Sequence, residues 1–373
     1  MPSLIDEDSS RPTRSLADFD VATLQDELSR AGLIPSHAKR LLRAYYDGGG
    51  AIDFAAIDVG KAVRAWSDAN IRPASRIGFR SVSSDGTVKL LLHLQAGGTV
   101  ETVLMPGHRP DRAAGCVSSQ VGCAMGCDFC ASTRGGLERN LTSGEIVEQF
   151  LHLRSQAAAM GRRLTSLVFM GMGEPMHNLD HVIPAIRRIS SPALGTMSGR
   201  HITVSTVGIV PGIERLAAED LNVHLALSLH APDDETRSRL VPANRRYRVE
   251  QIMEAAKRFQ DRAGRIVTIE YCLLDGINDS DDHATALADL MNGFRAHVNL
   301  IPYNPIGFGL SGIAYRKPGR ARVDAFLRIL WNANVVAHVR ETRGDDVSAA
   351  CGQLRQAQEP QLVTLAASAI SHA

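Results

Sequence analysis

Three cysteines, Cys123, Cys127 and Cys130, lie within eight residues of one another with the spacing C-x3-C-x2-C. Thiolates this close in sequence can bind one metal centre, because a short glycine-containing loop can fold round it with little chain to order. A structural zinc or iron–sulfur site is usually closed by four protein ligands, whereas three ligands leave one coordination position open for a substrate or cofactor. The loop therefore indicates chemistry at a metal centre.

A zinc knuckle is the alternative for this loop, with His108 or His152 as the fourth ligand. A zinc ribbon would normally carry a second cysteine pair, and here Cys272 and Cys351 are far apart in the sequence. Four of the six cysteines lie between residues 116 and 130, unlike the spread pairs of a secreted disulfide framework. We therefore expect reduced thiols and a cytoplasmic protein.

The composition is that of an ordinary globular enzyme. The chain has 373 residues, 44% of them apolar, enough for a large core. No apolar stretch reaches the roughly 18 residues of a membrane helix, and the first residues lack the pattern of a signal peptide, so we expect no membrane association. The formal net charge is +1, so a nucleic-acid partner would have to be bound by local basic patches.

The elements that must position the cysteine loop follow an α/β order. Thr142 and Glu145 form a capping-box pattern, which predicts a helix beginning near Ser143, soon after the loop. Beyond it, strand-like apolar runs alternate with segments of helical periodicity, which predicts a parallel sheet, open or closed into a barrel, with ligands at the carboxyl ends of the strands. The strand-like runs are 166–170, 201–206, 223–229, 266–274, 297–302 and 335–339.

The chain divides into five expected parts. The first is too poor in apolar residues to order itself, and the second shows short amphipathic helical stretches that make it a candidate RNA-binding domain. The third contains Asp85-Gly86, a hairpin signal between two strand-like runs. The parts are a disordered leader (1–15), a helical accessory domain (16–75), a β-hairpin extension (76–108), an α/β core (109–345) and a C-terminal segment (346–373).

Several motifs carry a family resemblance. With the cysteine loop, Gly171-Met-Gly-Glu-Pro175 resembles the radical S-adenosylmethionine (SAM) superfamily, in which the open iron of a 4Fe–4S cluster chelates the cofactor. Longer stretches resemble the RlmN/Cfr family of RNA adenine methyltransferases, over roughly residues 80–355. They are Cys116-Val-Ser-Ser-Gln-Val-Gly-Cys123, Arg139-Asn-Leu-Thr142, Tyr303-Asn-Pro305 and Thr342-Arg-Gly-Asp-Asp-Val-Ser-Ala-Ala-Cys-Gly-Gln353. The resemblance implies that the core is an incomplete (β/α)6 radical SAM barrel.

The resemblance also implies a reaction: methylation of carbon 2 of adenine in 23S ribosomal RNA, with transfer RNA as a further candidate substrate. Ring carbons of adenine are poor nucleophiles, so displacement of methyl from a sulfonium cannot alkylate them, whereas a radical made with a low-potential cluster avoids that barrier. The alternative within the family is methylation of carbon 8. An alternative of another class is a zinc-stabilised RNA-binding protein without catalysis.

Three residues would carry the methyl transfer if the resemblance holds. Cys351 would be methylated by one SAM molecule, and a 5′-deoxyadenosyl radical from a second would remove hydrogen from that methyl group. Cys116 would then attack the Cys351 sulfur and form a transient disulfide as the product leaves; the alternative for Cys116 is a packing cysteine. Glu101 would accept the proton lost from the base; the alternative is a solvent-facing acidic side chain.

Cofactor contacts are expected at the ends of the strands. Gly173 would let the backbone approach a ligand closely, and Glu174 could bind the methionyl ammonium of SAM. The resemblance implies that the metal ligands are Cys123, Cys127 and Cys130. It implies further SAM contacts from Ser205, Ser228, Leu229, His230 and Asn304.

The segment 237–248 contains five arginines, at 237, 239, 245, 246 and 248. Such a run is either a solvated loop or a contact surface for RNA phosphates. Besides RNA, we expect an electron donor such as flavodoxin as a partner, and a monomeric protein.

Overall fold

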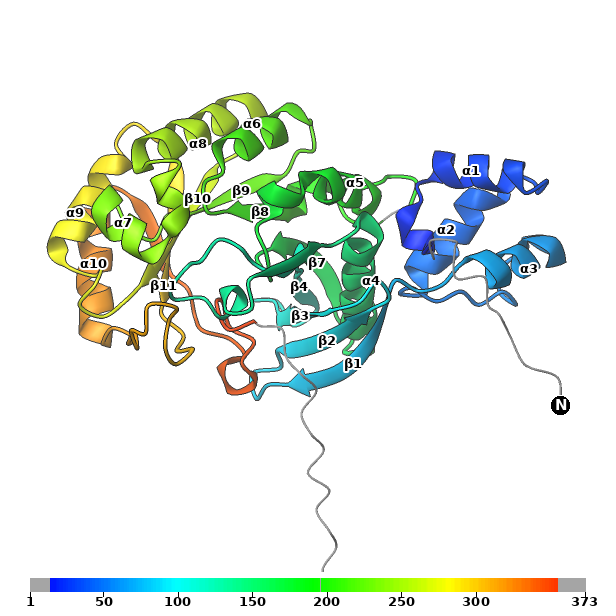
Figure 1. Cartoon of the computed structure of the whole chain (residues 1–373), viewed down its shortest axis with the longest axis horizontal. Helices are drawn as coiled ribbons and strands as arrows, with labels where there is room; N and C mark the ends of the chain where they lie inside the picture. The colour runs from blue at the N-terminus through cyan, green and yellow to red at the C-terminus, as the bar shows by residue number, and fades with distance from the viewer. Residues whose placement is uncertain (1–13, 195, 355–373) are drawn as a thin grey trace, which may run out of the picture.

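The computed structural model describes residues 14–194 and 196–354 (Figure 1). The expected leader at 1–15 therefore lies almost entirely outside the described residues, as does most of the C-terminal segment expected at 346–373. Cys351 lies within the described part. Among the described residues, no helix is both long and apolar enough to cross a membrane.

Three short helices lie at one end of the molecule, shown in blue in Figure 1. They are α1 (Val21–Arg30), α2 (His37–Asp47) and α3 (Gly60–Asn70). The Asp20 side chain caps α1 by accepting a hydrogen bond from the backbone N–H of Thr23 at 2.8 Å. Each helix buries an apolar stripe and is too short to be stable alone, so packing supplies most of its stability.

A single ten-stranded sheet runs through the rest of the described chain in the order β1-β2-β3-β4-β7-β8-β9-β10-β11-β12. Its first strands are β1 (Ser75–Val82), β2 (Val88–Leu94), β3 (Thr99–Pro106) and β4 (Arg112–Cys116). These four strands pair with one another antiparallel, and the hairpin predicted at Asp85-Gly86 is confirmed, with Val82 opposite Val88.

The strands from β4 to β12 form the parallel part of the sheet. They are β4, β7 (Arg163–Phe169), β8 (Ile202–Thr206), β9 (His224–Ser228), β10 (Val267–Leu273), β11 (Ala296–Pro302) and β12 (Val336–Val339). All six strands predicted from apolar runs are present within a few residues of the expected bounds. A separate small hairpin joins β5 (Gln120–Gly122) to β6 (Leu137–Asn140).

Helices connect the consecutive parallel strands and cover the outer face of the sheet (Figure 1). They are α4 (Ser143–Ala159), α5 (Leu179–Ile189), α6 (Val210–Ala218), α7 (Asp234–Leu240), α8 (Val249–Ala263), α9 (Asp281–Leu290) and α10 (Arg320–Asn332). The described sheet ends at β1 and β12 without a pair between them. This is the incomplete (β/α)6 barrel expected from the sequence.

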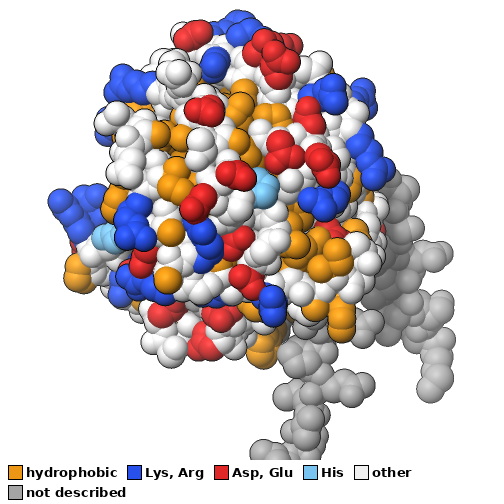
Figure 2. Space-filling view, turned by 90° about the vertical axis from the view of Figure 1, so that its left-hand side faces the viewer, with side chains coloured by type: hydrophobic (Ala, Val, Ile, Leu, Met, Phe, Trp, Pro, Cys, Tyr) orange, Lys and Arg blue, Asp and Glu red, His pale blue; other side chains and the backbone are white. Residues whose placement is uncertain are grey.

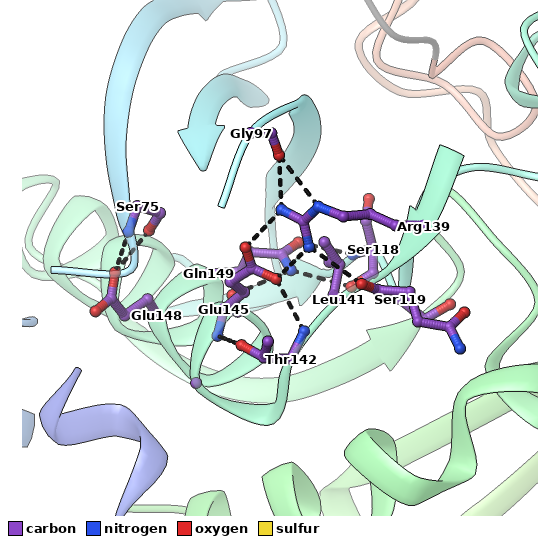
Figure 3. Close-up of polar contacts among 12 residues, drawn as sticks. Ser75, Gly97, Ser118, Ser119, Arg139, Leu141, Thr142, Glu145, Glu148 and Gln149 are labelled. Carbon is purple, nitrogen blue, oxygen red and sulfur yellow. Dashed lines mark hydrogen bonds and ion pairs between the residues drawn. The ribbon is translucent and has the colours of Figure 1, made fainter. Parts of the chain in front are cut away.

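Helix α4 joins the barrel to the N-terminal helices. It begins at Ser143, as predicted, with both hydrogen bonds of the Thr142–Glu145 capping box present. One turn later, the buried Glu148 carboxylate accepts hydrogen bonds from Tyr45 Oη, and from the backbone N–H groups of Ala74 and Ser75, each at 2.7 Å. Figure 3 shows the Ser75 contact beside the capping box. Since Tyr45 lies on α2, one carboxylate fixes the helical part against the barrel.

Candidate active site

A cavity lies where the parallel strands end, the edge of the sheet at which ligands bind in folds of this kind. Its wall combines the cysteine loop with the carboxyl ends of strands β7 to β11 and with the segment that follows β12. Most of the predicted site residues line it together. These are Cys123, Cys127, Cys130, Gly173, Glu174, Ser205, Ser228, His230 and Cys351.

The cysteine loop is held by the β5–β6 hairpin and by Asp128. Gly122 has φ 75°, and a Cβ atom there would lie 2.0 Å from the carbonyl oxygen of Gly136, so only glycine fits. The Asp128 carboxylate accepts hydrogen bonds from Ser311 N at 2.7 Å and from Tyr315 Oη at 2.5 Å. The loop is thereby tied to the segment that follows β11. Nothing in the spacing of the cysteines could have indicated this anchor.

The loop thiols are suited to a metal cluster. Burial raises the pKa of Cys123 to about 12 and also raises the pKa of Cys127 and Cys130, with the neighbouring thiols adding to the effect at Cys123 and Cys127. Buried thiolates need a compensating positive charge, and iron supplies it. Among the described residues, no group of three His, Cys, Asp or Glu side chains is arranged to hold a single metal ion. In a 4Fe–4S cluster each thiolate binds its own iron, so the three sulfur atoms need not meet at one ion.

Glu174 places a buried carboxylate at the cavity. Its oxygens accept hydrogen bonds from Met176 N at 3.0 Å and from Val207 N at 2.9 Å, while its own N–H donates to Gln120 Oε1 at 2.8 Å. Burial raises the pKa of Glu174 to about 7, although these hydrogen bonds oppose the shift. Gly173 has φ 101°, so the backbone passes close to Gln120. A cationic ligand group such as an ammonium would satisfy this carboxylate.

Histidine 230 is buried and neutral. Its Nδ1 accepts a hydrogen bond from Cys272 N at 3.0 Å, its ring lies 4.8 Å from that of Phe129, and burial lowers its pKa to about 3. Ser205 donates to the carbonyl of Phe169 at 2.7 Å. Both residues therefore sit in fixed positions at strand ends, as predicted.

Two predicted cofactor residues do not line the cavity. Leu229 is fully buried beside it. The Asn304 amide donates to the Cys351 carbonyl at 3.2 Å and accepts from Thr342 Oγ1 at 3.1 Å. In this structure Asn304 therefore binds the segment that carries Cys351.

Cys116 is the last residue of β4, and Cys351 lies near enough to influence its pKa. Burial raises the pKa of Cys116 to about 12, with the nearby Cys351 adding to the shift. The pKa of Arg340, which follows β12, is raised mainly by the nearby Cys351, and Cys116 adds to this effect. All six cysteines lie among the described residues and all are free thiols. The structure therefore shows no disulfide bond between Cys116 and Cys351, and a disulfide between them is not supported.

Glu101 lies on β3, where it is 2% exposed. The alternative of a solvent-facing acidic group is therefore wrong. Its carboxylate forms an ion pair with Lys89 at 2.8 Å, and its carbonyl accepts from Ser118 Oγ at 2.7 Å. Through Ser118 it connects to the strand that ends in Cys116.

The arginine run divides into two kinds of residue. Arg237 is fully buried, and its guanidinium donates to the carbonyls of Leu229 at 2.9 Å and Ser228 at 3.2 Å. It supports the end of β9, so it is unavailable to RNA. The other four, Arg239, Arg245, Arg246 and Arg248, are exposed. Figure 2, viewed from the side of α7, α9 and α10, shows Lys and Arg side chains mixed with Asp and Glu over that face.

Helix α4 also positions the segment that follows Cys116, through Gln149, a residue that the sequence did not single out (Figure 3). The Gln149 amide accepts from Ser118 N at 2.8 Å and donates to Ser118 O at 3.0 Å. Glu145 binds both terminal nitrogens of Arg139, at 2.8 and 2.7 Å. Gln149 is fully buried on a helix that also buries Ile146, Phe150 and Leu153. A polar residue at such a position in the sequence is the signal that could have identified it.

Comparisons with known proteins agree with this geometry. The family model of the Radical SAM superfamily matches residues 117–288. A probable dual-specificity RNA methyltransferase RlmN 1 from Opitutus terrae is 52% identical over 350 residues, which cover 91% of this chain and 96% of that protein. A probable dual-specificity RNA methyltransferase RlmN from Rhodopirellula baltica is 42% identical, covering 94% and 93%. A solved radical SAM methyltransferase from Sphaerobacter thermophilus is 41% identical with a TM-score of 0.87, covering 93% of this chain and 100% of that one.

Proposed function

The chain belongs to the RlmN/Cfr family of radical SAM RNA methyltransferases, which use a 4Fe–4S cluster and S-adenosylmethionine, and we propose that it methylates carbon 2 of adenine in 23S ribosomal RNA and in transfer RNA. One observation carries the proposal: Cys351 lines the same cavity as the three loop cysteines. The words "dual-specificity RNA methyltransferase" in the relatives' names support two RNA substrates. We also propose that the enzyme acts in the cytoplasm, where ribosomal and transfer RNA would be its substrates.

Cys123, Cys127 and Cys130 would hold the cluster, and Glu174 would bind the ammonium of SAM. Once bound, the cluster and SAM supply a methyl group and a 5′-deoxyadenosyl radical that removes a hydrogen atom. The protein has to exclude water from that chemistry and hold the reacting groups in place. The buried walls of the cavity serve both purposes.

Cys351 would act as the methyl carrier. As a thiolate, after its proton has gone to solvent, its sulfur would attack the methyl carbon of SAM, so that an S–CH3 bond forms and S-adenosylhomocysteine leaves. After the thioether methyl has lost a hydrogen, its carbon bonds to carbon 2 of the adenine. The base would then lose the proton on carbon 2 to Glu101, and the electron lost with it would return to the iron–sulfur cluster, which gave up one electron when the radical was formed.

Cys116 would release the product. Its thiolate attacks the Cys351 sulfur, the S–C bond breaks, and the bonding electrons stay with the carbon, which takes up a proton to become methyl. The Cys116–Cys351 disulfide left behind must be reduced by an external donor before the next turnover. The raised pKa of Cys116, to which the nearby Cys351 contributes, supports this pairing.

The RNA would bind at the cavity mouth with its target adenine drawn out of the helix, at a cost of roughly a few kcal/mol. Arg239, Arg245, Arg246 and Arg248 are exposed on the segment that follows β9, and we assign them to phosphate contacts. Flavodoxin would supply electrons, and the protein would act as a monomer.

Mass spectrometry of ribosomal and transfer RNA nucleosides tests the function. A deletion strain should lack 2-methyladenosine, and the wild-type gene should restore it. A gene encoding Cys351→Ala should fail to restore it although the purified variant still binds iron and sulfide. Unchanged 2-methyladenosine in the deletion strain would refute the proposal, and loss of 8-methyladenosine instead would assign the reaction to carbon 8.

A further inference from the structure

Lys89 lies on β2, outside the motifs described above, and contacts the candidate proton acceptor. Its Nζ atom is 2.8 Å from Glu101 Oε1, with the lysine side chain 13% and the glutamate side chain 3% exposed. In the antiparallel pair of β2 and β3, Lys89 is opposite Val103, two residues from Glu101. Both side chains therefore project from the same face of the sheet, at a diagonal separation that a long side chain can span.

The same ammonium group also contacts the segment that carries Cys351. It donates to the carbonyl of Ser348 at 3.2 Å. This segment rests on the turn of the β1–β2 hairpin: Gly344 N donates to Asp85 Oδ2 at 3.0 Å, and Ser84 N donates to Asp346 Oδ2 at 3.0 Å. The hairpin thus holds the start of the segment, and Lys89 joins the segment to Glu101.

We propose that Lys89 is a positioning residue for methyl transfer, which fixes the Glu101 carboxylate relative to the segment that carries Cys351. The inference rests on the proposed roles of Glu101 as proton acceptor and of Cys351 as methyl carrier. A carboxylate acts as a general base only within hydrogen-bond reach of the proton it takes. The proton leaves carbon 2 of the adenine, which is joined to the Cys351 sulfur through the methylene group, so the distance between carboxylate and sulfur must be set by the protein.

A lysine is suited to this role because an ammonium has three N–H donors and can bind two acceptors at once. Glu101 is almost fully buried, and a buried carboxylate that loses its cation also loses its preferred position. Displacements of about 1 Å can lower the rate of a catalysed step roughly 100-fold. Lys89 should therefore matter for the step at the base and much less for the methylation of Cys351, in which no proton is taken from the base.

The test uses the reconstituted enzyme and separates the two half-reactions. In Lys89→Met we expect kcat for RNA methylation to fall roughly 10- to 100-fold, with KM for RNA and the rate of Cys351 methylation unchanged within about twofold. Cys351 methylation is followed by mass spectrometry of the Cys351 peptide. Lys89→Arg keeps the charge and should recover most of the rate. Lys257→Met, on α8, is the matched control and should behave as wild type.

A double variant distinguishes positioning of Glu101 from a general structural effect. If Lys89 acts through Glu101, then Lys89→Met should cost little further activity in a Glu101→Gln background. Its full loss in that background, or normal kcat in Lys89→Met, would overturn the inference. If Lys89→Met does not fold, two other variants serve for the test. One is Lys89→Arg, and the other is the double variant, in which both partners of the buried pair are changed. A wild-type enzyme whose Cys351 never carries methyl would instead refute the proposed function.

Discussion

Replacing Glu148 by alanine should detach the N-terminal helices from the barrel. The carboxylate accepts five hydrogen bonds, from Ser15 Oγ at 2.5 Å, Tyr45 Oη, Ala74 N and Ser75 N at 2.7 Å each, and Ser75 Oγ at 2.8 Å. A hydrogen bond to a charged group contributes about 1.5–3 kcal/mol, but bonds to one shared carboxylate do not add. Breaking a buried charged network by removing one partner typically costs about 3–5 kcal/mol. We therefore expect Glu148→Ala to lower the free energy of unfolding of the helical part by about 3–5 kcal/mol.

The two tryptophans of the chain report this loss separately. Trp66 lies on α3 and Trp331 on α10, so single-tryptophan variants follow each part by fluorescence during urea unfolding. In Glu148→Ala the Trp66 transition should move to lower urea than the Trp331 transition. Glu254→Ala, which removes only an exposed pair with Arg258, is the control and should change stability by less than about 1 kcal/mol. Coincident, unshifted transitions in Glu148→Ala would refute the reasoning.

Three further predictions follow from the buried polar groups. Burial lowers the pKa of His230 to about 3, so the unfolded chain binds more protons than the folded chain between about pH 3 and 6.5. The free energy of unfolding should therefore fall on acidification below pH 6.5, by up to about 1.4 kcal/mol per pH unit. His230→Gln should flatten that slope in urea unfolding at pH 7.5 and 5.5, and an unaltered slope would show that His230 is not its source. Gln149→Ala leaves Ser118 N and O unbonded and should cost roughly 1–3 kcal/mol in the same assay; wild-type stability would mean that water replaces the amide. Cys116→Ala should accumulate a covalent protein–RNA adduct on denaturing gels, and no adduct would return Cys116 to a packing role.

The strand ends and the cysteine loop were predictable because their signals are local. Apolar runs mark buried parallel strands, and a parallel sheet brings its carboxyl ends to one edge. This rule alone places Ser205, Ser228 and His230 beside one another, and the structure has all three at the cavity. The assignment of roles to Cys351 and Glu101 needed the resemblance, because neither residue is distinctive in its own neighbourhood.

The contacts that tie distant segments together were not predictable from local patterns. Arg237 stands in a charged run, yet it is buried because its guanidinium satisfies strand-end carbonyls. The Lys89–Glu101 pair depends on the register of two antiparallel strands, and Glu148 depends on where the N-terminal helices pack. Each of these charged side chains is buried with partners that are remote in sequence, and neither composition nor periodicity indicates which residues those partners are.

The central claim is that the methyl group reaches the base by way of Cys351, and an isotope measurement tests it directly. The enzyme is supplied with SAM whose methyl group carries three deuterium atoms, and the methyladenosine formed in the RNA is weighed by mass spectrometry. One deuterium is lost while the methyl is on Cys351 and is replaced by hydrogen from solvent when Cys116 releases the product. Transfer by way of Cys351 therefore predicts a methyl group with two deuterium atoms, whereas three deuterium atoms would show direct transfer from SAM and contradict a role for Cys351 as methyl carrier.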